Sequence, residues 1–255
     1  MRTILVTGGT AQLGRPTVSA LQEAGHVVRV LSRSHSAGTL SGDLLTGRGL
    51  GRALSGVETV VHLASTGSAQ DVAATTLLSA FARSAGVEHV VFMSIVGIDD
   101  IPLPYYRAKR EAEGVIVASG IPHTVLRATQ FHSFVESLFT AQRRILPVTL
   151  VPRFSFQAIS VHDVAARLVE LVAAGPAGRV PDIGGPQVLT GHELATRWKL
   201  AAGSRRPLVP LRISGRTVAA FAAGADLVPG PPFGQGTFEE HLAARYPLAR
   251  SESSR

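Results

Sequence analysis

The sequence contains no cysteine, which excludes disulfide bonds and thiolate metal sites. It also lacks any run of about 18 apolar residues, so no membrane-spanning segment is expected. Charged residues make up only 17% of the 255 residues and hydrophobic residues 45%, a composition that supports an extensive buried core. The first residues lead directly into a predicted strand with no signal-peptide pattern, and we therefore expect a cytoplasmic protein.

Lysine is nearly absent as well, since only Lys109 and Lys199 occur and all other basic side chains are arginines. The net charge is +7, but the arginines are scattered and form no long run. A positively charged cleft for a phosphorylated ligand explains this charge as well as nucleic-acid binding does. We expect a small-molecule substrate, no nucleic-acid or membrane partner, and a monomer or homodimer.

Apolar runs alternate with segments of helical period along the first half of the chain. Strands are predicted at 3–8, 26–33, 58–65, 88–97 and 122–129, and helices at 14–25, 49–56, 71–86 and 104–120. Continuous apolar strands that alternate with helices indicate a parallel sheet covered on both faces. The predicted fold class is α/β, a doubly wound (Rossmann) sheet whose ligand site lies at the carboxyl ends of the strands.

The last third of the chain is less regular. Helices are predicted at 161–175, where His162 and Asp163 are expected to cap, and at 189–203, where Thr190 and Glu193 have the spacing of a capping box. Prolines then divide the chain into short pieces. We expect a dinucleotide-binding domain at 1–178, with an excursion into a substrate lobe near 130–157, and a small C-terminal substrate-capping lobe at 179–255.

A glycine-rich turn, TGGTAQLG at residues 7–14, joins the first strand to the first helix. In this context Gly8 permits the tight turn, Gly14 allows close packing of helix on strand, and the helix N-terminus faces a pyrophosphate. Ala11 replaces the middle glycine of the usual pattern, which is tolerable if its φ is negative. The alternative is a strand–helix turn without a ligand. The cofactor contacts predicted here are Gly8, Thr10, Gln12, Leu13 and Gly14.

No acidic residue follows the second predicted strand until Asp43. An acid at that strand end usually binds the ribose 2′-hydroxyl of NAD, whereas here Arg33 stands where a 2′-phosphate would lie. Guanidinium groups bind phosphate by paired, charge-assisted hydrogen bonds, and the hydroxyls of Ser32 and Ser34 add donors. This pattern favours NADP(H) over NAD(H), with Asp43 and Leu44 near the adenine, unless Arg33 is simply solvated.

Three residue types suited to hydride-transfer chemistry lie near one another in the sequence. Ser94 ends a predicted strand, and Tyr105 and Lys109 share one face of the next helix. The lysine is expected to lower the pKa of the tyrosine phenol, and the serine hydroxyl to polarise a carbonyl. The trio would then supply a proton donor, its tuning charge and an orienting hydroxyl. Alternatively, Tyr106 is the donor, or the segment is only a charged amphipathic helix.

These motifs resemble those of a known superfamily. The TGGT turn, VVHLAS (60–65), the strand-ending Ser94 and the Y-x-x-x-K motif resemble the short-chain dehydrogenase/reductase superfamily. GIPHTVLRATQFH (120–132) and DIGGPQVLTGHELA (182–195) are similar to its atypical, NmrA-like NAD(P)-binding branch. The resemblance implies a Rossmann fold with a C-terminal substrate lobe and NADPH-dependent reduction of a carbonyl or related group.

The resemblance also implies roles for individual residues. Ala64 and Ser65 would lie along the cofactor ribose, and Ser94 near the nicotinamide. The interval from Ser94 to Tyr105 is shorter than in the extended members of the superfamily. In related isoflavone-reductase-like enzymes the lysine of this helix is the principal catalytic group, which favours Lys109 over Tyr105.

Gln130, Phe131 and His132 follow the strand that would end beside the nicotinamide, and Phe156 lies further along the chain. Their aromatic, mostly uncharged character suits an apolar or aromatic substrate, although phenylalanines of this kind also form cores. No cluster has the spacing of metal ligands, and no metal is expected.

The function predicted from the sequence is an NADPH-dependent reductase of a small apolar or aromatic carbonyl, quinone or enone. One alternative is a non-catalytic NADP-sensing regulator, which the altered glycine motif favours and the Y-x-x-x-K motif opposes. A sugar-nucleotide epimerase or dehydratase is a second alternative, which the short C-terminal lobe opposes.

Overall fold

The computed structural model describes residues 1–33 and 38–247. The chain divides into two compact units. The first comprises residues 1–128 and 164–182, and the second comprises residues 129–163 and the described residues from Ile183 onward. Among the helices of the described residues, none has the length and apolar character needed to cross a membrane.

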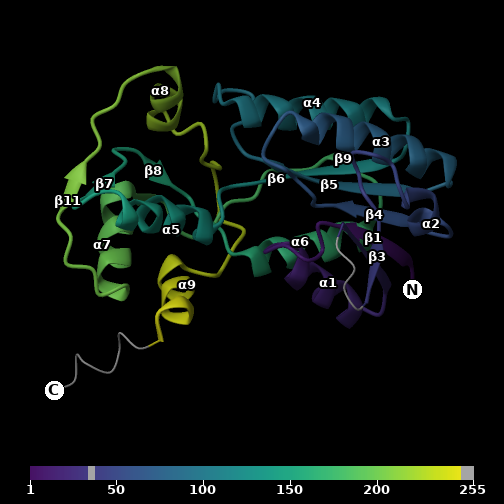
Figure 1. Ribbon diagram of the computed structural model, residues 1–255, viewed down its shortest axis with the longest axis horizontal. Coiled ribbons are helices and arrows are strands. Elements are labelled where there is room, and N and C mark those ends of the chain that lie inside the picture. Colours follow the sequence, from purple (N-terminus) through teal and green to yellow (C-terminus); the bar gives the residue numbers. More distant parts are fainter. Residues whose placement is uncertain (34–37, 248–255) are drawn as a thin grey trace. The chain divides into compact units, whose positions relative to one another are not determined.

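The first unit is built on a seven-stranded parallel sheet (Figure 1). Its order is β3-β2-β1-β4-β5-β6-β9, so the chain winds outward in both directions from β1 and β4. The strands are β1 (Thr3–Thr7), β2 (Val27–Ser32), β3 (Thr39–Ser41), β4 (Thr59–His62), β5 (His89–Ile95), β6 (His123–Ala128) and β9 (Gly178–Arg179). All five predicted strands form, and the predicted doubly wound fold is confirmed.

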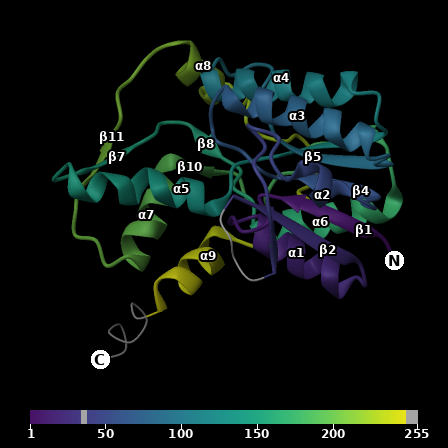
Figure 2. The same cartoon turned by 45° about the vertical axis from the view of Figure 1, so that its right-hand side comes forward.

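Helices cover both faces of this sheet, as Figures 1 and 2 show. The helices are α1 (Gly14–Glu23), α2 (Leu50–Leu54), α3 (Gln70–Ser84), α4 (Pro104–Ala118) and α6 (Val161–Ala174). The helices α3 and α4 lie side by side over one face, and α1 and α6 lie against the other. A core cluster on the first face joins Leu50 of α2, Leu78 of α3, Ile116 of α4 and Phe92 of β5, and it explains why the strands are continuously apolar.

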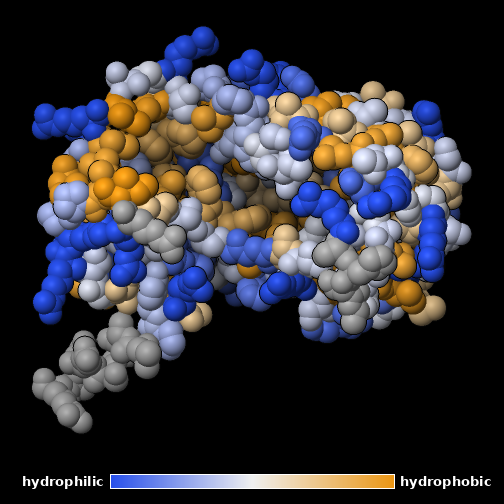
Figure 3. Space-filling model, viewed as in Figure 1, coloured by the Kyte–Doolittle hydropathy of each residue, from blue (hydrophilic) through white to orange (hydrophobic). Residues whose placement is uncertain are grey.

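The second unit contains short elements around its own core. They are α5 (His132–Thr140), the 3₁₀ helix η1 (Ala141–Arg144), β7 (Thr149–Val151), β8 (Ser155–Phe156), β10 (Leu189–Thr190), α7 (Gly191–Ala201), β11 (Leu208–Pro210), α8 (Arg216–Ala222) and α9 (Phe238–Arg245). β10 pairs antiparallel with β8, and β11 pairs parallel with β7. In this core, the ring centroids of Phe139 and Trp198 lie 5.6 Å apart. Figure 3 shows apolar residues exposed over β7 and β11.

The two expected helix caps have different outcomes. The capping box of α7 is present, since the Thr190 hydroxyl accepts from the Glu193 amide and the Glu193 carboxylate accepts from the Thr190 amide. Asp163 lies in the first turn of α6, but its Oδ2 accepts from the amides of Gln235 and Gly236 at 2.9 and 3.0 Å. Asp163 therefore holds the segment before α9, a long-range role that local sequence does not reveal.

Candidate cofactor and catalytic site

The turn between β1 and α1 requires glycine at two positions. Gly8 has a φ of +71°, and a Cβ there would lie 2.8 Å from the amide nitrogen of Ala64. A Cβ on Gly14 would lie 2.1 Å from the carbonyl oxygen of Gly8. The helix therefore starts so close to the strand end that a side chain at either position would displace the backbone.

Ala11 fits this turn without strain. No non-glycine residue among those described has a positive φ, so Ala11 has the negative φ that alanine adopts readily. Its amide donates to the Gly8 carbonyl at 3.0 Å, and its carbonyl accepts from the Arg15 amide at 3.0 Å. Thr10, Ala11 and Gln12 are exposed at the turn, whereas Leu13 is buried.

The end of β2 carries Ser32, which is half-buried, and Arg33, which is exposed. Ser34 lies outside the described residues. The Asp43 carboxylate accepts a hydrogen bond from the Leu45 amide at 2.8 Å and so stabilises its own loop, while Leu44 packs on the core.

His62, at the end of β4, was not singled out from the sequence. Its Nδ1 lies 2.7 Å from the Thr7 hydroxyl of β1, and its Nε2 lies 3.2 Å from the Thr75 hydroxyl of α3. Burial lowers the pKa of His62 to about 3, and the positive charge of Lys109 acts in the same direction. The ring is therefore neutral at physiological pH, and it ties two strands and a helix together near the carboxyl edge of the sheet.

Ser65, Asp71 and Tyr105 form a hydrogen-bonded chain beside this edge. The Ser65 hydroxyl donates to Asp71 Oδ2 at 2.5 Å, and its oxygen lies 3.1 Å from the Tyr105 hydroxyl. Asp71, in the first turn of α3, is buried and also accepts from the Thr66 amide at 2.6 Å. The signal that could have revealed Asp71 is a carboxylate at the start of a helix just after a strand end.

The expected effect of Lys109 on Tyr105 is wrong. Burial raises the pKa of the Tyr105 phenol, the negative charge of Asp71 raises it further, and the hydrogen bond with Ser65 only partly opposes this. In the part of the chain that the structure describes, no hydrogen bond or ring contact joins Lys109 to Tyr105. The Lys109 ammonium instead lies 4.4 Å from the centroid of the Phe92 ring.

Lys109 is only 4% exposed and carries its charge in the interior. Burial lowers the pKa of its ammonium to about 8, whereas the negative charges of Asp71 and Glu113 act in the opposite direction. Burial therefore brings the pKa of this ammonium closer to neutral pH than that of an exposed lysine.

Ser94 lies near the end of β5 and is 1% exposed. Its hydroxyl has no hydrogen-bond partner among the described residues. Side chains alternate along a strand, so Ser94 points to the same face of β5 as Phe92, the ring beneath Lys109. Strand β5 and helix α4 thus bring two of the three predicted catalytic residues to one face of the sheet.

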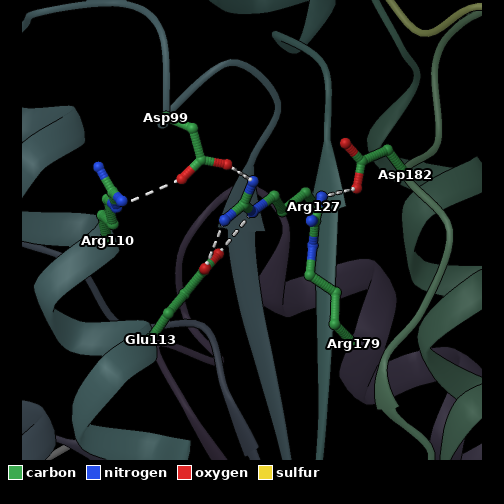
Figure 4. Close-up of polar contacts among 6 residues, drawn as sticks. All are labelled: Asp99, Arg110, Glu113, Arg127, Arg179 and Asp182. Carbon is green, nitrogen blue, oxygen red and sulfur yellow. Dashed lines mark hydrogen bonds and ion pairs between the residues drawn. The ribbon is translucent and has the colours of Figure 1, made fainter.

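A buried ion pair anchors α4 to the sheet (Figure 4). Arg127 of β6 donates from Nε and Nη2 to the two carboxylate oxygens of Glu113 at 2.8 and 2.7 Å, and from Nη1 to Asp99 at 2.5 Å. Tyr105, Lys109 and Glu113 are spaced by four and share one helix face. Anchoring Glu113 therefore also fixes the position of the other two side chains along the sheet.

The predicted substrate-lining residues lie in the second unit. His132 is buried, its Nε2 lies 3.1 Å from the Ala158 carbonyl oxygen, and burial lowers its pKa to about 4. Phe156 belongs to the core of that unit, and Gln130 is buried as well. Phe131 is half-buried and pairs with Ile159 in an isolated bridge. Their contact with a substrate stays a prediction.

Fold and site together define an α/β protein of the dinucleotide-dependent class, in which a glycine-rich strand–helix turn faces the carboxyl edge of a parallel sheet. Residues 8–174 match a family model described as NAD(P)H-binding. The chain belongs to this NAD(P)H-binding family, as the resemblance to NmrA-like short-chain reductases predicted.

Three comparisons agree with this assignment. A (4-alkanoyl-5-oxo-2,5-dihydrofuran-3-yl)methyl phosphate reductase of Streptomyces griseus subsp. griseus is 30% identical, covering 80% of this chain and 75% of the relative. An NAD(P)H azoreductase of Xenophilus azovorans is 28% identical over 78% of this chain and 74% of the relative. The structure of an Escherichia coli NADPH-dependent quinone oxidoreductase with NADPH has a TM-score of 0.76 at 19% identity, covering 95% of this chain and 99% of that chain.

The chain is an NAD(P)-dependent oxidoreductase. The predictions of an enzyme of the short-chain reductase type and of a nicotinamide dinucleotide cofactor are confirmed.

Proposed function

We propose that this oxidoreductase uses NADPH to reduce a small apolar or aromatic carbonyl, quinone or enone. The observation that carries the proposal is the junction of α4 with β5. There the buried Lys109 ammonium lies over Phe92, the buried Ser94 hydroxyl has no partner in the described chain, and both lie on the α4 side of β5. A buried hydroxyl without a partner costs free energy, which a ligand oxygen would recover.

The residues of this junction have distinct roles in the proposed reaction. When bound, the cofactor supplies a hydride at its nicotinamide. Ser94 donates a hydrogen bond to the acceptor oxygen and orients it. Tyr105, or a water molecule held by Lys109, delivers the proton. The Lys109 charge stabilises the negative charge that develops on the oxygen.

The cofactor site rests on the turn and on the end of β2. The amides at the N-terminus of α1 suit the pyrophosphate, and Gly8 and Gly14 let the helix start close to the end of β1. The exposed Arg33 suits a 2′-phosphate, and the NADPH-bound quinone oxidoreductase of the same fold supports this choice. Both named relatives are reductases of conjugated or azo compounds, which supports an electron-poor unsaturated substrate.

The test is NADPH oxidation, followed by absorbance, with a panel of quinones, enones and aromatic ketones. Lys109→Ala should lower turnover by at least a hundredfold and weaken NADPH binding by less than tenfold, because the side chain acts on the reacting oxygen. Lys199→Ala, in α7 of the second unit, removes the other lysine and is the matched control. If NADPH binds and alters association with another protein, but no substrate of the panel causes NADPH oxidation, the result would instead favour a non-catalytic NADP-sensing regulator.

A further inference from the structure

Asp71 is a buried carboxylate for which the proposed reaction has no role. Each of its two carboxylate oxygens accepts a hydrogen bond from a short chain of hydroxyl groups, called an arm below, and the two arms lead in different directions. One arm runs through Ser65, at 2.5 Å, to the Tyr105 hydroxyl at 3.1 Å. The other runs through the Thr66 hydroxyl, at 2.8 Å, to the Ser68 hydroxyl at 2.8 Å. Asp71 therefore connects Tyr105 to an exposed serine by hydrogen bonds alone.

The directions of these hydrogen bonds follow from counting protons. Ser65 has one hydroxyl proton and gives it to Asp71, so Tyr105 must donate to the Ser65 oxygen. Thr66 likewise gives its proton to Asp71, so Ser68 must donate to Thr66. Both arms thus converge on the carboxylate as their acceptor.

Burial distinguishes Asp71 from the rest of this chain of hydrogen bonds. Asp71 is 4% exposed, whereas Ser65, Thr66 and Ser68 are exposed and Tyr105 is half-buried. Asp71 also accepts from the Thr66 amide, which fixes its position in the first turn of α3. The buried carboxylate therefore lies between two chains of hydroxyl groups, one that ends at Ser68 and one that ends at Tyr105.

We propose that Asp71 is a relay residue that returns a proton to Tyr105 through Ser65 after each reduction. The inference rests on the proposed function and on the first of its two proton donors, the Tyr105 phenol, which gives its proton to the substrate oxygen. Lys109 offers no such path in the described structure, because its ammonium lies over Phe92 and no hydrogen bond among the described residues links it to Tyr105.

Each proton transfer in the relay breaks one O–H bond and forms another. The Tyr105 O–H bond breaks when its proton passes to the substrate oxygen, which leaves a phenolate. Asp71 takes a proton from solvent on Oδ1 by way of Ser68 and Thr66, and a half-turn of the carboxylic acid about its Cβ–Cγ bond then brings this proton to the side of Ser65. Asp71 then gives a proton to Ser65 as Ser65 gives its own to Tyr105. The final state, with Tyr105 donating to Ser65 and Ser65 donating to Asp71, is the observed arrangement of the Tyr105 arm.

The experiment separates the first turnover from the following ones, with NADPH and 1,4-naphthoquinone as probes in stopped flow. Asp71→Asn keeps an acceptor for the Thr66 amide but cannot carry the proton. The rate of the first turnover should stay within about threefold of that of the unsubstituted protein, and the steady-state rate should fall at least tenfold. The solvent deuterium isotope effect on the steady-state rate should also change. Added imidazole should restore much of the lost rate by acting as a mobile proton donor.

Two further variants keep the proposal falsifiable. Ser65→Ala breaks the same arm without touching α3, and it should reproduce the steady-state loss, whereas Asp100→Asn, an exposed carboxylate of the same unit, should change neither phase. A normal steady state and isotope effect in Ser65→Ala at an unchanged melting temperature would overturn the relay. If Tyr105→Phe keeps a normal first turnover, the proposed proton donor itself is wrong, a result distinct from failure of the relay alone.

Discussion

At the scale of single residues, Lys109 combines a charge with almost complete burial. An ammonium is compact enough to lie 4.4 Å above the Phe92 ring, whereas a guanidinium is larger and planar. The cost of removing this charge from water is offset in part by Asp71 and Glu113, both of which favour the charged form. A chain that otherwise uses arginine thus places a lysine where size and an adjustable pKa both matter.

Arg33 provides a test of cofactor choice. Arg33→Ala should weaken NADPH binding at least tenfold, about 1.4 kcal/mol, because the 2′-phosphate loses a charged, paired donor. NADH has no 2′-phosphate, and its affinity should change less than threefold. Fluorescence titration of both coenzymes measures the difference, and Arg52→Ala, an exposed arginine of α2, is the control. Equal losses for the two coenzymes would contradict the assignment.

Replacement of glycine by alanine should have opposite effects at two positions, Gly14 and Gly114. Gly14→Ala puts a methyl group 2.1 Å from the Gly8 carbonyl oxygen, so the turn must open. Cofactor affinity should fall at least tenfold, and the melting temperature should decrease. Gly114→Ala in α4 meets no atom within 4 Å and should stabilise the helix by about 0.5–1 kcal/mol. Calorimetry on both variants checks the pair, and a cofactor affinity unchanged by Gly14→Ala would exclude the turn as the phosphate site.

At the scale of elements, α4 determines the geometry of the site. Its residues Tyr105, Lys109 and Glu113 meet partners in the loop after β4, on β5 and on β6 in turn. Because these side chains belong to one rigid helix, a slip of α4 would displace all three together. The Glu113–Arg127 pair is the contact that resists such a slip.

A double-mutant cycle tests this anchor. Arg127→Met alone should destabilise the protein by roughly 3–5 kcal/mol, since it leaves the buried Glu113 carboxylate without its partner. Glu113→Leu should cost less, because Arg127 keeps its pair with Asp99. The variant that combines the two substitutions should recover most of the loss caused by Arg127→Met, because it removes both charges. Arg110→Ala, which breaks the exposed pair with Asp99, should cost less than about 1 kcal/mol. Denaturant unfolding measures all four variants, and additive losses would show that the pair is not coupled.

Local sequence predicted the helices and five of the seven strands of the first unit, because those strands are apolar and several of the helices end at glycine. The short edge strands β3 and β9 were not predicted. It also predicted which elements bring Ser94 and Lys109 to the carboxyl edge. The short helices α5, α8 and α9 were not predicted, since they depend on packing within the second unit. His62 and Asp71 were not predicted as site residues for a related reason. Their roles depend on partners such as Thr75 and Tyr105, which only the fold brings near.

At the scale of the whole molecule, both units contain histidines that are held neutral by burial. Burial lowers the pKa of His62 to about 3 and of His89 to about 4 in the first unit. It lowers the pKa of His132 to about 4 in the second unit. Asp226 has the opposite tendency, because burial raises the pKa of its carboxyl group to about 6. These four groups contribute to the response of the folded state to acid.

The sign of this response follows from proton linkage. A histidine with a folded pKa below its unfolded value of about 6.5 contributes its full stability above pH 6.5 and loses it as the pH falls toward 4. Asp226 binds a proton more readily in the folded state and offsets one histidine in the lower part of this window. Near pH 5 the unfolded state therefore binds about two more protons at these groups than the folded state does. This difference corresponds to a slope of roughly 2.7 kcal/mol per pH unit in the free energy of unfolding.

We therefore expect the free energy of unfolding to decrease steeply from pH 6.5 to pH 4.5 and to change little from pH 7 to pH 8. Denaturant titrations at a series of pH values give the slope. His89→Gln should flatten it by about 1.4 kcal/mol per pH unit, because one titrating site is lost. His192→Gln, at an exposed position of α7, should leave it unchanged. A flat profile between pH 6.5 and 4.5 would mean that the interior admits protonated histidine, contrary to the burial of these rings.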